Sequence, residues 1–171
     1  MRAFFIHTAR DLDDSTQWYN RGPDYASGYG LLQIGDAVEQ MQSGFFIENA
    51  IHDAQQKEYW MEILPDAADV KISLTWDDPP AVENASKALV NDLDIVVYDP
   101  KGKRYFPWTL NSSDPSAAAV RTREDDVNNV EQIFIESEAL YPGIWQVLVK
   151  GTHVPEGPQI FSVTSSVKMY H

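Results

Sequence analysis

The spacing of apolar residues changes near Gly44, and this change restricts the fold more than any other feature of the sequence. After Gly44, apolar and polar residues alternate in several short segments, as they do at Ile72, Leu74 and Trp76. A period of two sends successive side chains to opposite faces of a strand, so one face of each segment can be buried. The expected strands fall at 45–50, 57–63, 71–76, 92–97, 104–108, 130–136, 145–150 and 161–167.

Turn residues separate many of these segments, and the run 99–102 (Asp-Pro-Lys-Gly) is typical of a hairpin turn. No helical pattern separates the expected strands, which argues against a parallel sheet. We therefore predict a mainly β fold, an antiparallel β-sandwich of jelly-roll type with about eight strands. The long polar segment 111–128 is expected to form a loop at one end of the sandwich.

Before Gly44 the apolar residues recur every three or four positions, which predicts two short α-helices at about 3–9 and 29–41. A polar loop at 10–27 joins them. The apolar stripe of the second helix consists of Leu31, Leu32, Ile34, Ala37, Val38 and Met41. Helices this short need a packing partner to be stable. We expect two parts, a helical segment at 1–43 and a β-sandwich domain at 44–171.

Composition excludes several functional classes. The 171 residues include 26 acidic and 13 basic side chains, which gives a formal net charge of −13. Such a chain, without a basic run, repels phosphate backbones, so we expect no nucleic-acid partner. No apolar stretch approaches the ~20 residues of a membrane span. The absence of cysteine excludes disulfides and thiolate chemistry.

Catalytic patterns are lacking. The four histidines, His7, His52, His153 and His171, have no metal-binding spacing, and we expect His7 to have a structural role in the core or at a helix end. Ser165 and Lys168 match a Ser-x-x-Lys pattern, but they lie in a terminal strand without its companion motifs. We therefore expect no catalytic residue in this chain, and no acid pair stands out for glycoside chemistry.

The segment Asn91-Asp92-Leu93-Asp94 is a candidate metal site, because Asp92 and Asp94 share one face of an expected strand. Two carboxylates this close need a compensating charge, and calcium prefers oxygen ligands. The further candidate ligands are Asp77, Asp78, Asn91, Asn128, Asn129 and Glu131. The alternative is that the two aspartates are solvated or accept hydrogen bonds from turn backbone.

Two groups of motifs resemble one family. The first comprises 2–9 (RAFFIHTA), 22–25 (GPDY) and 28–32 (GYGLL), and it resembles the end of the catalytic domain of subtilisin-like serine peptidases. The second comprises 89–94 (LVNDLD), 128–131 (NNVE) and 154–159 (VPEGPQ), and it is similar to the β-sandwich appended to some bacterial subtilases. Together they span nearly the whole chain.

The resemblance implies a secreted serine endopeptidase as the parent protein, with this chain as its C-terminal part. The catalytic aspartate, histidine and serine of the family map onto no position here. The implied function is that of a non-catalytic accessory domain that stabilises the catalytic domain of the same polypeptide, with calcium as an expected cofactor. We leave open whether the apolar stripe folds onto the sandwich, pairs with a second chain or frays. We expect the fragment to self-associate.

A carbohydrate- or surface-binding jelly-roll module is the alternative function. The candidate aromatic residues for such a role are Tyr59, Trp60, Tyr105, Trp108 and Trp145. The competing interpretation is that these side chains fill the core, since aromatic side chains dominate core burial.

Overall fold

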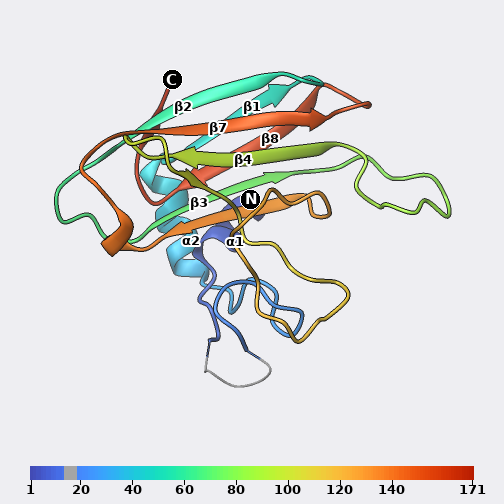
Figure 1. Ribbon diagram of the computed structural model, residues 1–171, viewed down its shortest axis with the longest axis horizontal. Coiled ribbons are helices and arrows are strands. Elements are labelled where there is room, and N and C mark those ends of the chain that lie inside the picture. The colour runs from blue at the N-terminus through green and yellow to red at the C-terminus, as the bar shows by residue number, and fades with distance from the viewer. Residues whose placement is uncertain (14–18) are drawn as a thin grey trace.

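A computed structural model describes residues 1–13 and 19–171, and part of the expected loop 10–27 therefore lies outside the described residues. The described residues form two antiparallel sheets and two short α-helices, which confirms the predicted mainly β sandwich (Figure 1). Within these residues, no helix has the length and apolar character of a membrane-spanning segment.

The first sheet has four strands in the order β1-β8-β3-β6. Its strands are β1 (Phe46–Ile51), β8 (Gln159–Ser165), β3 (Val70–Trp76) and β6 (Val130–Ile135). The second sheet has five strands in the order β5-β4-β7-β2-β9. Its strands are β5 (Arg104–Tyr105), β4 (Asp92–Tyr98), β7 (Gly143–His153), β2 (Gln56–Ile63) and β9 (Met169–Tyr170).

The core lies between the two sheets and consists of the apolar members of the alternating segments. Ile72 and Leu74 of β3 are fully buried, as are Trp145 and Val147 of β7. Their polar neighbours in sequence point away from this core, which is the arrangement that a period of two predicts. The fifth strand is shorter than the expected segment 104–108, and the terminal strand β9 was not predicted.

Helix α1 (Arg2–Thr8) packs against β3 and β8 of the four-stranded sheet, and α2 (Ile34–Ser43) packs against α1 (Figure 1). Phe4 of α1 meets Phe46 of β1 edge to face, with ring centroids 5.1 Å apart. Helix α1 thus buries its apolar face on the sandwich itself.

The predicted start of the second helix at about residue 29 is wrong. Gly30 has a φ of +105°, which the left-handed region allows for glycine. Leu31 then exchanges backbone hydrogen bonds with Arg10, at 2.8 and 2.9 Å, instead of entering a helix. A contact across twenty residues therefore overrides the local helical pattern.

His7 is buried between α1 and β3, as the sequence predicted. Its Nδ1 lies 3.1 Å from the Ser73 hydroxyl oxygen. Burial, and secondarily the positive charge of Lys71, lower the pKa of His7 from 6.5 to about 3. Because this folded-state pKa lies well below neutral pH, His7 is neutral in the folded protein.

We expect the contribution of His7 to the free energy of unfolding to fall as the pH drops below its ordinary pKa of 6.5. In this pH range the unfolded chain binds a proton at His7 more readily than the folded chain does. The free energy of unfolding therefore loses about 1.4 kcal/mol per pH unit from His7, or roughly 2 kcal/mol by pH 5. Urea unfolding at pH 7 and pH 5 measures this loss. In His7→Gln the loss should shrink by that amount, whereas the exposed control His153→Gln should behave as wild type. If His7→Gln lost as much stability as wild type between pH 7 and pH 5, His7 could not be the source of the loss.

Candidate functional site

Three buried carboxylates gather where β4 of one sheet approaches β6 of the other. Asp92 and Asp94 lie on β4, and Glu131 lies on β6; their residues are 7%, 3% and 0% exposed. We call these three residues the acidic cluster. Strand β5 pairs only with Val97 and Tyr98, so the earlier part of β4 has a free edge. The Ile95 N–H on that edge donates to Glu131 Oε2 at 2.7 Å, and this bond joins the two sheets.

The acidic cluster is electrostatically unfavourable. Burial, together with the nearby Asp94 carboxylate, raises the pKa of Glu131 well above its ordinary value. Burial also raises the pKa of Asp94 to about 6, and Glu124 and Asp92 push it in the same direction. Burial raises the pKa of Asp92 as well, although Lys87 opposes this effect. The cluster therefore favours a bound proton or cation.

Two lysines and a hydroxyl group partly compensate the acidic cluster. Lys87 Nζ lies 3.2 Å from Asp92 Oδ2. The Thr152 hydroxyl donates to Asp94, and Lys150 pairs with Glu124 at 2.5 Å. The register between β4 and β7 shifts at Asp92 and Leu93, and this irregularity sets Thr152 beside the cluster.

Two carboxylate oxygens of the acidic cluster remain without a partner. Asp92 Oδ1 and Glu131 Oε1 are buried and have no hydrogen bond among the described residues. A buried carboxylate oxygen without a partner is costly, since it loses its hydration without replacement. Oxygens of this kind match the ligand preference of a hard cation such as calcium.

The other candidate metal ligands are not brought to the acidic cluster. The Asp77 side chain is 99% exposed and pairs with Arg2, and the Asp78 carboxylate accepts the N–H groups of Val90 and Asn91. The Asn91 side chain is hydrogen-bonded to Glu156 and Gln159.

The two later asparagines also have other partners. Asn128 donates to Asp125 at 2.7 Å, and Asn129 donates to the Trp76 carbonyl oxygen at 3.0 Å. In the part of the chain that the structure describes, no group of three or more histidine or acidic side chains is placed to hold a metal ion. A cation at the acidic cluster would thus depend on backbone or water oxygens for its other ligands.

Sequence reasoning missed Lys87, Glu124, Lys150 and Thr152 beside the cluster. Lys87 precedes Asp92 by only five residues, so its proximity was a usable signal. Lys150 and Thr152 reach the cluster through the pairing of β4 with β7, which the local sequence does not reveal.

A second candidate site is an exposed apolar surface on the N-terminal segment. It consists of five side chains that are between 40% and 64% exposed: Leu31, Leu32, Ile34, Val38 and Met41. We call them the helix surface. They form most of the apolar stripe of the expected second helix, whose packing partner the sequence left open, and only Ala37 of α2 is buried. Helix α1 occupies the sandwich, so Ile34, Val38 and Met41 of α2 face solvent, as do Leu31 and Leu32 just before the helix.

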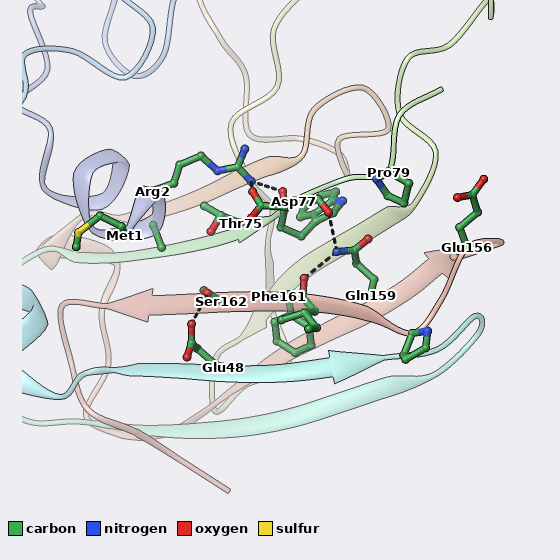
Figure 2. Close-up of a pocket in the computed structure, with 14 residues that line it drawn as sticks. Met1, Arg2, Glu48, Thr75, Asp77, Pro79, Glu156, Gln159, Phe161 and Ser162 are labelled. Carbon is green, nitrogen blue, oxygen red and sulfur yellow. Dashed lines mark hydrogen bonds and ion pairs between the residues drawn. The ribbon is translucent and has the colours of Figure 1, made fainter. Parts of the chain in front are cut away.

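A groove of about 450 Å³ near the start of the chain lies over the outer part of β1, β3 and β8 (Figure 2). The Arg2 guanidinium reaches across it to the Trp76 carbonyl oxygen and to Asp77, while Glu48 and Glu156 lie on its rim (Figure 2). No residue of the acidic cluster lines this groove. Its wall includes Met1 and Ala3 at the first turn of α1.

The aromatic side chains do not form a binding platform. Tyr59 and Trp145 are fully buried, and Trp108 is 8% exposed beneath the Arg121 guanidinium. Trp60 and Tyr105 are half-buried. Three of the five candidate aromatics therefore belong to the interior, which weakens the carbohydrate-binding alternative.

The Ser73–His7 pair is the type of contact from which nucleophilic catalysis is built, but it is inaccessible. Ser73 is 0% and His7 4% exposed, and the Gln132 amide donates to the same hydroxyl oxygen at 3.1 Å. The geometry therefore assigns this pair to the attachment of α1 to β3.

Comparisons with known proteins point to serine proteases of much greater length. No family model matches the chain. The serine protease/ABC transporter B family protein tagD of Dictyostelium discoideum is 25% identical over 140 residues, which cover 75% of this chain and 8% of that protein. The related protein tagB of the same organism is 31% identical over 90 residues, or 53% of this chain and 5% of that protein.

Among solved structures, the CspB protease of Clostridium perfringens matches 77% of this chain and 28% of its own chain, with a TM-score of 0.46 and 10% sequence identity. The chain spans less than a tenth of either curated relative. It is thus similar in sequence to short parts of two long proteins named as serine proteases.

Proposed function

We propose that this chain is a non-catalytic accessory domain of a secreted, subtilisin-like serine endopeptidase, and that it stabilises the catalytic part of the same polypeptide. The observation that carries this proposal is the helix surface, which is ordered and apolar but uncovered. The sequence similarity of the chain to parts of two long serine proteases supports its proposed place in a larger protease. The buried Ser73–His7 pair is consistent with a structural rather than a catalytic role.

The energetics favour a covered helix surface. Fully burying a leucine, isoleucine, valine or methionine side chain contributes about 1.5–3 kcal/mol. Covering the exposed half of five such side chains would contribute roughly 5 kcal/mol, which is a large part of the stability of a typical domain. An exposed apolar surface of this kind is characteristic of an interaction site. The proposed occupant is the catalytic domain of the same polypeptide.

We also propose that the acidic cluster takes up calcium, as the sequence motif suggested. The unpartnered oxygens of Asp92 and Glu131 supply the required chemistry. The ion would offset the repulsion among buried carboxylates and so stabilise the edge at which the two sheets meet. Binding only to the folded state would raise its stability by mass action.

Without its catalytic partner, the chain is expected to self-associate through the helix surface. Sedimentation velocity should show association that strengthens with added salt, since the net charge of −13 otherwise repels the copies. The double variant Ile34→Glu, Val38→Glu should remain monomeric. Val82→Glu, at a side chain 80% exposed in a distant loop, is the matched control. A wild-type chain that stays monomeric at every salt concentration would contradict this use of the surface.

A further inference from the structure

Lys87 is the cation that the protein itself supplies to Asp92. Its ammonium group contacts Asp92 Oδ2, while its side chain is 46% exposed and that of Asp92 only 10%. Lys87 belongs to the segment 77–91, which contains no helix or strand. A partly exposed ion pair of this kind contributes little and is readily broken.

The ion pair provides a partner for only one of the two carboxylate oxygens of Asp92. Its second oxygen, Oδ1, is buried without a partner, and the negative charges of Asp125 and Asp126 lie close enough to oppose ionisation of Asp92. A divalent cation that engages both oxygens of this carboxylate would meet the Lys87 ammonium group at Oδ2. Two positive charges on one carboxylate repel each other, so the more weakly held charge is displaced.

The segment around Lys87 depends on this contact. Among residues 79–89, Lys87 has the only side-chain hydrogen bond or ion pair to the rest of the described protein. Asp78 secures the base of the segment through the N–H groups of Val90 and Asn91, and Leu89 is buried in the core. Loss of the Lys87 contact would therefore free the middle of the segment but not its ends.

We infer that Lys87 is an internal counter-ion that competes with a divalent cation for Asp92, so that cation uptake releases the middle of segment 77–91. This inference rests on the proposed cation site and adds its regulation. The lysine partly neutralises Asp92 in the cation-free domain, and it sets the calcium concentration at which the ion takes over. Segment 77–91 thereby reports whether the acidic cluster is occupied.

The test compares wild type with Lys87→Met. Lys168→Met serves as the control because Lys168 is exposed and has no ion pair with any residue that the structure describes. Melting temperature is measured against calcium chloride, with sodium chloride to match ionic strength and a chelator as the zero point. Loss of a competing ion pair worth up to about 1 kcal/mol should lower the calcium concentration at half effect about five-fold in Lys87→Met. Lys168→Met should match wild type.

Hydrogen exchange of the amides of residues 79–89 supplies the second measurement. Calcium should speed exchange there in wild type and in Lys168→Met, whereas Lys87→Met should exchange rapidly with or without calcium. If calcium raises the melting temperature but Lys87→Met has an unchanged or weaker calcium response, the competition is wrong and the cation site stands. If calcium alters neither wild type nor Lys87→Met, the cation proposal fails together with this inference.

Discussion

Replacement of Asn91 with alanine should lower the free energy of unfolding by about 3 kcal/mol, because three hydrogen bonds in the interior are lost together. Asn91 is fully buried. Its amide donates to the Glu156 carbonyl oxygen at 2.9 Å and to Gln159 Oε1 at 2.8 Å, and its Oδ1 accepts the Glu156 N–H at 3.1 Å. Alanine would leave these partners in place without a hydrogen bond.

Equilibrium urea unfolding of Asn91→Ala measures this loss. The control is Asn111→Ala, since Asn111 is exposed and its side chain accepts a single local hydrogen bond from the Ser113 N–H. This control should stay within about 0.5 kcal/mol of wild type. Equal unfolding midpoints for the two variants would show that the Asn91 contacts do not stabilise the fold. The result also separates the structural role of Asn91 from the metal-binding role that the sequence suggested.

Replacement of Glu131 with glutamine should stabilise the protein in chelator at neutral pH and raise the melting temperature by several degrees. The amide oxygen can still accept the Ile95 N–H, while the charge that repels Asp94 and Asp125 is removed. The folded-state pKa of Glu131 lies above its unfolded value, so the contribution of Glu131 to stability falls as the pH rises. The gain from glutamine should therefore be larger at pH 8 than at pH 5.

Glu131→Ala is the informative companion variant. It removes the same charge but leaves the buried Ile95 N–H without an acceptor, at a cost of about 1–3 kcal/mol. We expect Glu131→Ala to melt below Glu131→Gln at every pH. A Glu131→Gln protein that is less stable than wild type in chelator at pH 8 would contradict the view that this charge is a burden in the cation-free state.

The sandwich was predictable because its signal is local and repeated. Each strand of the core carries its own alternation, as at Ile72 and Leu74, and the residues between strands are turn formers. The helical pattern failed at 29–33 because Leu31 pairs with Arg10. The sequence likewise indicates that the stripe of the second helix is apolar but not what covers it.

The candidate site was predictable only in part. A spacing of two indicated that Asp92 and Asp94 share one face, but it showed neither their burial nor the nearby charge of Asp125, more than thirty positions later in the chain. Asn91, Asn128 and Asn129 were plausible oxygen ligands by residue type alone. Their actual partners lie in turns and loops whose positions follow from the tertiary fold.

The proposed accessory role is tested most directly by the rate of heat inactivation of the proposed longer polypeptide, with and without Ile34→Glu and Val38→Glu. The rate is followed by the serine-peptidase activity that the proposal expects. If the helix surface covers the catalytic domain, the double variant should lose activity several-fold faster than wild type, although the isolated variant chain melts normally. Val82→Glu should leave the rate unchanged. Identical inactivation rates in all three proteins, or a parent without peptidase activity, would contradict the accessory role.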